Sequence, residues 1–408
     1  MQWASSFDVA CCLDSNNFAD QYSSFDVLMA IGVKDELITA AGNAFEELEI
    51  FRIKHPGWIT GFLSYDLKNE IENLSSAKVD RLQFPDLCFF VPRHLILIKG
   101  NEIEIIADDP ESVFENIKQQ NIHSQNEGSK PELKLQSRIS KSDYLNAVEI
   151  IKLHIARGDI YITNFCQEFF AEEALVDPLS LFIKLNEISP NPFAAYFKWK
   201  DKYILCASPE RFLANRFKKL ISQPIKGTAK RGKNNNEDET IKEEFRNQIK
   251  ELQENVMIVD LVRNDLTHSA KKGSVKTEEL FGIYSFKQVH QMISTVVCEL
   301  DNDCTEIQAI KNTFPMGSMT GAPKISAMQL MEQFEQSRRG VYSGAIGYFS
   351  PDGNFDFNVV IRSILYNRET KYLSFHVGSA ITYAADANKE YEECMLKAQA
   401  ILEVLGQV

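Results

Sequence analysis

The sequence predicts an α/β protein. Residues 95–98 and 103–106 are short apolar runs on either side of a turn at 99–101, which is the pattern of a β-hairpin. Within residues 144–155, apolar side chains recur at helical spacing, and Gly158 follows as a helix stop signal. A length of 408 residues allows two or three domains, or one large α/β body.

The composition is that of an ordinary globular protein, with 44% hydrophobic and 25% charged residues, and it argues against collagen-like repeats, coiled coil and disorder. The formal net charge of -13 leaves no basic field for a phosphate backbone, so we expect no nucleic-acid partner. No apolar run reaches the ~18 residues of a membrane span, and residues 1–8 lack the features of a secretory signal. We therefore expect a cytoplasmic protein without membrane contact.

The eight cysteines occupy positions 11, 12, 88, 166, 206, 298, 304 and 394. None of them forms a C-x-x-C pair or a zinc-type spacing, and they are too dilute for a disulfide scaffold. We expect them to be reduced.

One change in composition divides the chain. Residues 123–141 are nearly devoid of large apolar side chains and lie between segments that are rich in them. We interpret residues 123–140 as a linker between an N-terminal region, 1–122, and a larger domain, 141–408. A second polar stretch, residues 230–239, is interpreted as an exposed loop of the larger domain.

Two predicted helices each carry an E-x-x-E pair beside an apolar stripe. In the segment 241–265 the stripe consists of Phe245, Ile249, Leu252, Val256 and Val259, and Glu251 and Glu254 lie off it. Near the C-terminus the stripe consists of Tyr391, Met395, Ala398, Leu402 and Leu405, whereas Glu390, Glu393 and Lys397 share another face.

Such a glutamate pair has two interpretations. On an isolated helix it is an ordinary solvated face. Like charges at i,i+3 repel each other unless a positive group lies between them. If the two helices faced each other, four carboxylates would converge, and a hard divalent cation such as Mg²⁺ would offset their charge. The periodicity leaves both interpretations open.

Six short motifs follow one another in the larger domain. They are A-S-P-E-R at 207–211, P-I-K-G-T at 224–228, M-I-V-D-L-V-R-N-D at 257–265, F-P-M-G-S-M-T-G-A-P-K at 314–324, S-G-A-I-G-Y at 343–348, and Glu390-x-x-Glu393 with Lys397. In this order they resemble the chorismate-utilising enzymes, which include anthranilate synthase component I, aminodeoxychorismate synthase component I, isochorismate synthase and salicylate synthase. Residues 57–66 also resemble the N-terminal part of the two aminating members. The resemblance implies a sandwich of two large, mostly antiparallel sheets with helices on the outside, which the first ~120 residues join.

Lys226 distinguishes among the members of this family. The resemblance implies a P-I-A-G-T turn in anthranilate synthases and a lysine at its centre in aminodeoxychorismate synthases, and this chain has Lys226 before Gly227 and Thr228. By resemblance, the Lys226 amine attacks C2 of chorismate as the C4 hydroxyl leaves; ammonia then adds at C4 and the lysine departs. The amine must be neutral, so we expect its pKa to lie below the reference value of about 10.4.

The resemblance implies roles for two further residues. Glu210 matches the residue assigned as general acid, and proton donation is needed because hydroxide is a poor leaving group. His290 matches a family histidine that is linked to pyruvate loss in anthranilate synthases, and here a catalytic and a structural role are both open. The other six histidines, at 55, 94, 123, 154, 268 and 376, match no catalytic position.

Metal and substrate ligands also come from the resemblance. It implies that Glu254 and Glu393 bind Mg²⁺, that Glu251 and Glu390 hold metal-bound waters, and that the ring carboxylate of chorismate meets the metal. The second carboxylate and the rest of the substrate would be held by Arg362, Tyr342, Gly227, Thr228, Lys397, the hydroxyls of Ser318 and Thr320, and backbone donors at Gly378, Ser379 and Ala380.

Two positions depart from the family pattern. Ile162 stands where relatives have glutamine, or the lysine base of the isochorismate-type members, and this argues against an isochorismate product. Residues 378–380 read Gly-Ser-Ala where the family has a glycine-rich turn.

The expected function is that of aminodeoxychorismate synthase component I, in folate synthesis. The chain shows no Gly-x-Cys-x-Gly nucleophile elbow, so the resemblance implies that a separate glutamine amidotransferase supplies ammonia. Anthranilate synthase component I is an alternative, which Lys226 disfavours. A catalytically idle chorismate-binding subunit is another, motivated by Ile162 and by the altered turn.

Overall fold

The computed structural model describes residues 1–72, 74–120 and 133–407. Among these residues every strand pairing is antiparallel. The strands are β1 (Val9–Asp14), β2 (Val27–Thr39), β3 (Ile59–Leu63), β4 (Leu87–Lys99), β5 (Glu102–Ile106), β6 (Gln136–Ser137), β7 (Ile162–Ala171), β8 (Phe193–Trp199), β9 (Lys202–Ser208), β10 (Arg211–Arg216), β11 (Lys219–Gln223), β12 (Ile225–Lys230), β13 (Lys276–Ser285), β14 (Val289–Glu299), β15 (Gly321–Ala322), β16 (Ala345–Phe349), β17 (Phe355–Asn358), β18 (Ser363–Asn367) and β19 (Tyr372–Ile381).

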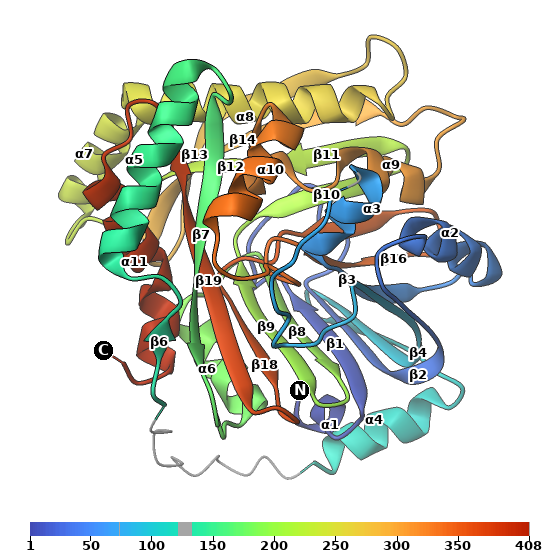
Figure 1. Cartoon of the computed structure of the whole chain (residues 1–408). Helices are drawn as coiled ribbons and strands as arrows, with labels where there is room; N and C mark the ends of the chain where they lie inside the picture. The colour runs from blue at the N-terminus through green and yellow to red at the C-terminus, as the bar shows by residue number, and fades with distance from the viewer. Residues whose placement is uncertain (73, 121–132, 408) are drawn as a thin grey trace.

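The strands form two packed layers (Figure 1). The first layer runs in the order β7, β19, β18, β9, β8, β1. The second runs β2, β4, β3, β16, β17, β10, β11, β14, with β12 and β13 on β14. The layers meet face to face, as the rings of Phe62 in β3 and Phe197 in β8 lie 5.2 Å apart. The predicted two-layer antiparallel fold is confirmed, and the β1–β2 pair additionally joins both layers into one hydrogen-bonded network.

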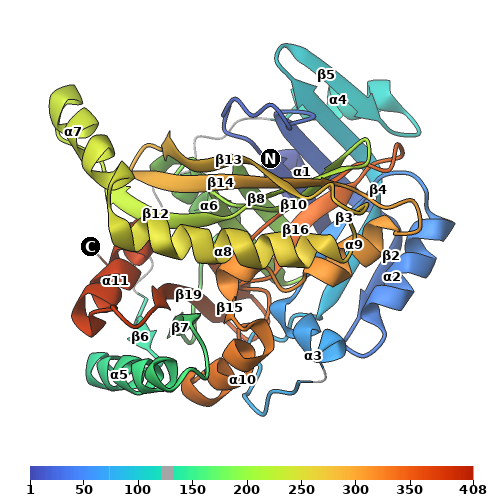
Figure 2. The same ribbon diagram turned by 90° about the horizontal axis from the view of Figure 1, so that it is seen from above.

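Helices cover the outside of these layers (Figure 2). They are α1 (Gln2–Ser5), α2 (Ala44–Lys54), α3 (Lys68–Ile71), α4 (Pro110–Lys118), α5 (Lys141–Arg157), α6 (Pro178–Ile188), α7 (Asn235–Arg246), α8 (Ile249–Thr267), α9 (Glu306–Thr313), α10 (Lys324–Phe334) and α11 (Ala387–Val404), with 3₁₀ turns η1 (Tyr65–Leu67) and η2 (Gly317–Met319). Helices α5 and α11 pack on β19, and α8 packs on β12 and β14. None of the helices in the described residues is long and apolar enough to cross a bilayer.

Several local predictions are confirmed. Strands β4 and β5 form the expected hairpin. Helix α5 ends at Gly158, whose left-handed backbone (φ 86°) suits a residue without a side chain. The N-terminal region joins the main body, because β1 pairs with β8 and β3 pairs with β16. All eight cysteines are free thiols, and all but Cys304 are buried.

Two predictions about the polar segments of the larger domain were wrong. Residues 230–239 are not a loop throughout, because Asn234 caps α7 and residues 235–239 are helical. The segment 241–265 is not one helix either, since α7 ends at Arg246 and α8 starts at Ile249. This break shifts the helix phase, so that Ile249 and Val256 of the expected buried stripe are 70% and 41% exposed.

The expected linker, residues 123–140, lies partly outside the described residues. Of its described part, Gln136 and Ser137 form β6 and pair with β7, and Ser140 caps α5 through its side chain. This end of the linker is therefore held against the first layer. The boundaries of the N-terminal region and of the larger domain stay a prediction.

Candidate active site

A pocket lies where β12, α8, η2, β19 and α11 meet, with about 750 Å³ of space between its atoms. Most of the expected site residues line it: Glu210, Lys226, Gly227, Thr228, Glu251, Glu254, Ser318, Tyr342, Arg362, Gly378, Ala380, Glu393 and Lys397. These residues come from eight separate segments of the sequence, and the fold brings them together around one cavity.

Lys226 projects from β12 into this pocket. Its Nζ donates a hydrogen bond to the backbone oxygen of Ser318 at 3.2 Å. Removal from water lowers the pKa of Lys226, and the nearby carboxylate of Glu254 partly opposes this. The expected direction of the pKa shift is therefore present, and it favours the neutral amine that a nucleophile needs.

Gly227 lets the chain turn closely past α8. Its backbone is left-handed (φ 94°), and a methyl group at this position would lie 2.9 Å from Oε2 of Glu251 and 3.0 Å from the ring of Phe245. A glycine after Lys226 thus allows strand β12 to approach the acidic face of α8.

Glu210 lies between β9 and β10, in the P-E-R stretch, and only 4% of it is exposed. Burial raises the pKa of Glu210 to about 7, against the opposing influence of the Ser318 hydroxyl and the Lys226 ammonium. A carboxyl group with this pKa is partly protonated at neutral pH, as a general acid requires.

The two E-x-x-E helices face each other. Lys250 of α8 reaches across to Glu390 of α11 at 2.8 Å and also lies 3.6 Å from Glu254. Burial raises the pKa of Glu254 to about 7, and the neighbouring Glu251 and Glu390 add to the rise. Burial alone would also raise the pKa of Glu393, but the Lys397 ammonium at 2.6 Å holds it below its usual value. The two helices therefore face each other around Lys250, and Glu251, Glu254 and Glu393 line one pocket, which excludes the interpretation as ordinary solvated faces.

The carboxylate group fits a hard cation. Oε1 of Glu254 and Oε2 of Glu390 are buried and have no hydrogen-bond partner among the described residues. Two such oxygens on facing helices are an arrangement that a divalent cation preferring oxygen ligands would satisfy. No three acidic, histidine or cysteine side chains of the described chain are gathered at ligand spacing, and the ammonium groups of Lys250 and Lys397 lie beside them instead.

Arg362 and Tyr342 also line the pocket. Arg362 precedes β18 in a left-handed conformation (φ 52°), and its guanidinium donates no hydrogen bond within the described part of the chain. Burial lowers the pKa of Arg362 to about 10, so it stays cationic at neutral pH. A half-buried guanidinium without a hydrogen-bond partner is suited to an anionic ligand. The ring of Tyr342 stacks on His376, with centroids 4.9 Å apart.

Four expected site residues are not among those that line the pocket. His290 is fully buried and binds Asp238 at 2.9 Å and Ser285 at 2.9 Å. Thr320 donates to backbone oxygens of η2 and its flank, and the Ser379 hydroxyl contacts Tyr144 at 3.0 Å. Glu390 is bound by Lys250 at the rim of the carboxylate cluster.

Three polar residues that sequence reasoning did not assign also line the pocket, namely Asn164, Gln291 and His376. Gln291 stands opposite Thr228 on β12, whereas His290 stands opposite Ala229. Since successive residues of a strand point to opposite faces, only one of His290 and Gln291 can face the site. His376 lies on the same face of its strand as Gly378 and Ala380. Because side chains of a strand alternate between faces, this spacing of two residues could have predicted from the sequence that His376 faces the pocket.

The chain belongs to the chorismate-binding enzyme family, whose model matches residues 15–403. Among its relatives are aminodeoxychorismate synthase component 1 of Bacillus subtilis, which is 32% identical over 86% of this chain and 77% of that protein, and anthranilate synthase component 1 of Thermus thermophilus, which is 30% identical over 91% of this chain and 86% of that protein. The fold matches the crystal structure of anthranilate synthase component I from Streptococcus pneumoniae, with a TM-score of 0.82 and 24% identity over 95% of this chain and 93% of the other.

Proposed function

We propose that this protein is an aminodeoxychorismate synthase component I, which converts chorismate and ammonia to 4-amino-4-deoxychorismate. The observation that carries the proposal is the position of Lys226, whose amine lies in the pocket beside Glu210 and the acidic faces of α8 and α11. Proteins named aminodeoxychorismate synthase are among the relatives at 32–39% identity. Relatives named anthranilate synthase are similarly close, so the proposal rests on Lys226 and not on overall similarity.

The proposed reaction uses Lys226 and Glu210 together. Nζ of Lys226 forms a bond to C2 of chorismate, the two conjugated ring double bonds both shift by one bond toward C4, and the C4 hydroxyl leaves as water with a proton from Glu210. Ammonia then bonds to C4 and gives a proton to the Glu210 carboxylate, the two double bonds shift back, and the C2–Nζ bond breaks to release the lysine. Lys226 therefore blocks C2 during amination and directs the nitrogen to C4.

The substrate is a dianion, and the pocket has a positive group for each end. The Arg362 guanidinium and the Tyr342 hydroxyl are proposed to bind the enolpyruvyl carboxylate, and Lys397 adds positive charge near the ring carboxylate. Glu254 and Glu393, with Glu251 and Glu390, would hold Mg²⁺, which when bound neutralises the ring carboxylate. A glutamine amidotransferase is the proposed source of ammonia, as the reaction consumes it.

One assay separates this function from its alternatives. The protein is incubated with chorismate, Mg²⁺ and ammonium, and the products are identified by mass and fluorescence. Aminodeoxychorismate supports the proposal, fluorescent anthranilate supports an anthranilate synthase, and binding without turnover supports an idle subunit.

Lys226→Ala is expected to abolish C4 amination or to move it to C2, because it removes the nucleophile. Lys230→Ala, at the exposed end of the same strand, is the matched control and should keep the wild-type rate and product. An unchanged product and rate in Lys226→Ala would eliminate the covalent route.

A further inference from the structure

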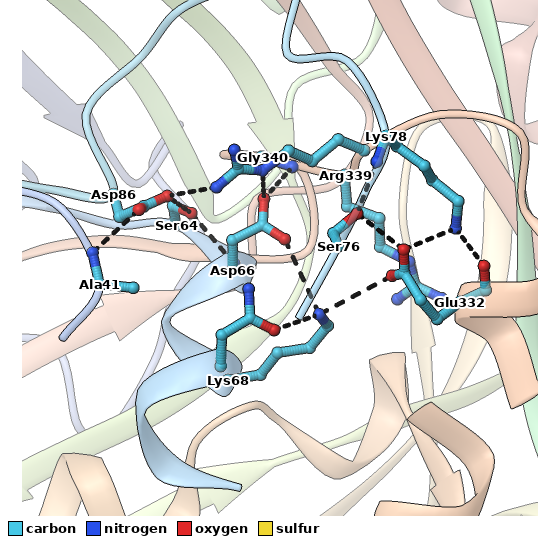
Figure 3. A network of polar contacts seen from close by, with 12 residues as sticks. Ala41, Ser64, Asp66, Lys68, Ser76, Lys78, Asp86, Glu332, Arg339 and Gly340 are labelled. Carbon is cyan, nitrogen blue, oxygen red and sulfur yellow. Dashed lines mark hydrogen bonds and ion pairs between the residues drawn. The ribbon is translucent and has the colours of Figure 1, made fainter. Parts of the chain in front are cut away.

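A second cavity lies beside the active site, with about 790 Å³ of space between its atoms. Its walls are residues 77–82 and 336–340, together with Arg138, Glu168 and Tyr372. Polar contacts hold these walls in place (Figure 3): Asp66 accepts hydrogen bonds from Arg338 at 2.7 Å and from the Gly340 backbone at 3.0 Å, and Lys78 binds Glu332 at 3.2 Å. A built cavity of this size has no role in the reaction described so far.

The cavity and the active site share one face of the β7–β19 ribbon. The register places Asn164 opposite Ala380, Cys166 opposite Gly378, and Glu168 opposite His376. Directly paired residues of antiparallel strands point to the same side, so Asn164 and Gly378 in the pocket and Glu168 in the second cavity belong to one surface. Cys166 and His376 lie between the two ends of this surface.

The surface between the cavities carries unused polar atoms. Nδ1 of His376 and Oγ of Ser374 are buried, and neither has a hydrogen-bond partner in the described part of the chain. Buried polar atoms are almost always paired with protein or with a small polar molecule. An unpaired imidazole nitrogen and an unpaired hydroxyl along this surface therefore suit a small solute that forms hydrogen bonds.

One hydrogen bond links the walls of the two spaces. His376 lines the active site, where it stacks on Tyr342, and its Nε2 is hydrogen-bonded to Oγ of Ser337 at 3.1 Å. Ser337 lines the second cavity. The two spaces are therefore neighbours, with the pair of His376 and Ser337 between them.

The charges of the second cavity are balanced. Its lining includes five basic side chains, Lys78, Arg81, Arg138, Arg338 and Arg339. Each of them is paired with a carboxylate, in the same order that of Glu332, Glu172, Glu168, Asp66 and Glu335. Neutral ammonia needs no charged partner, and it is the form that can attack carbon.

We propose that ammonia enters the active site from this second cavity, past Ser337 and His376 along the polar face of β7 and β19. This route rests on the proposed amination. It implies that chorismate and ammonia reach Lys226 from different sides of the pocket. The amidotransferase partner would then deliver ammonia at the 77–82 and 336–340 walls.

The test measures the KM for ammonium after the cavity is filled. Ser337→Phe places a ring between the cavity and His376, so the KM for ammonium should rise about tenfold while the affinity for chorismate, measured by calorimetry, stays the same. Ser274→Phe is the matched control, because Ser274 is also half-buried and its hydroxyl donates to the backbone oxygens of Lys271 at 2.7 Å and Glu299 at 3.4 Å, but it lines neither of the two cavities. The control should keep the wild-type KM.

A second variant avoids any effect of the ring on folding. Ser337→Cys in a Cys304→Ser background is folded first and then labelled with a benzyl thiosulfonate, since the seven remaining native thiols are buried. Labelling should raise the KM for ammonium in the same way. An unchanged KM in both blocked proteins overturns the ammonia route, whereas absence of any aminated product in the wild-type assay overturns the proposed function itself.

Discussion

The proposed reaction requires opposite protonation states of two side chains in the pocket: Glu210 must carry its proton, and the Lys226 amine must be free of its extra proton. Burial moves both groups toward the uncharged form, since it raises the pKa of Glu210 to about 7 and lowers the pKa of Lys226. A single cause, removal from water at the base of the pocket, therefore prepares both the acid and the nucleophile.

The pH dependence of adduct formation tests this pairing. The rate of the first step should fall as the pH rises above about 7, because Glu210 then loses its proton. Glu210→Gln should lower the rate roughly 10²- to 10⁴-fold and remove the decline at high pH. Rapid-mixing kinetics with mass detection of the Lys226 adduct would measure both.

Glu403→Gln, at the exposed end of α11, should keep the wild-type profile. Retention of the decline in rate above pH 7 in Glu210→Gln would assign the decline to another group.

The raised pKa of Glu210 also affects the pH dependence of stability. The contribution of Glu210 protonation to the free energy of unfolding is complete below the ordinary pKa of 4.5, and it is lost as the pH rises through about 7.

Residue identity could be predicted from the sequence where a motif fixes it, as at Lys226 and Glu210. Side-chain direction could not. His290 and Gln291 are adjacent, and only the pairing of β14 with β12 shows which of them faces the pocket. Arg362 likewise faces inward because of a left-handed backbone before β18, which no propensity predicts for arginine.

At the scale of elements, α8 and α11 show how an active site inverts helix patterning. The prediction for the segment 241–265 rests on the assumption that the apolar face of a helix is the buried face. In the structure Glu254 and Asn255 are buried, and Ile249 is exposed. Hydrophobic periodicity predicts that a segment is helical. It predicts the wrong buried face when charged side chains of the helix line a pocket.

Magnesium should stabilise the facing helices, because a cation that binds only the folded chain adds to its stability. We expect millimolar Mg²⁺ to raise the thermal unfolding midpoint of the wild-type protein. Glu254→Gln should reduce or abolish this rise by removing one of the unpartnered carboxylates. Scanning calorimetry with and without Mg²⁺ would measure the shifts.

Glu392→Gln is the control for this experiment, since Glu392 lies on the same helix as Glu393 but is exposed. It should respond to Mg²⁺ as the wild-type protein does. An equal Mg²⁺ response in Glu254→Gln would remove Glu254 from the metal site.

At the scale of the whole molecule, Arg211 ties three distant segments together. This guanidinium is buried between β10 and β17, where it binds Asp356 through two nitrogens at 3.0 Å each, and it also binds Asp20 and Gln223 at 2.5 Å. Asp20 belongs to the N-terminal region, between β1 and β2. Arg211, which follows Glu210, the proposed general acid, thus anchors the N-terminal region to the second layer.

Arg211→Ala should lower the free energy of unfolding by about 3–5 kcal/mol, because it leaves Asp356 buried without its main partner. Chemical denaturation would measure the loss. Arg263→Ala removes an exposed i,i+3 pair with Asp260 and should change stability by less than about 1 kcal/mol. Equal effects of the two substitutions would show that the Arg211 network contributes no more than a surface ion pair.

Local elements of the fold could be predicted from the sequence, whereas the pairing of strands that are distant in the sequence could not. The 95–106 hairpin and helix α5 depend on local patterns, so they could be predicted from short windows. The pairing of β3 with β16 joins residues nearly three hundred positions apart, and both strands are buried along their whole length. Strands buried on both faces lose the alternation that would reveal their neighbours.

Strand β1 belongs to both layers, because it pairs with β8 on one side and with β2 on the other. A trimmed chain that starts after Asp14 would expose two unsatisfied rows of backbone groups at once, one in each layer. Exposed strand edges of this kind invite pairing with other molecules. The first fourteen residues, although remote from Lys226, therefore protect the protein against self-association and are a poor place for shortening it.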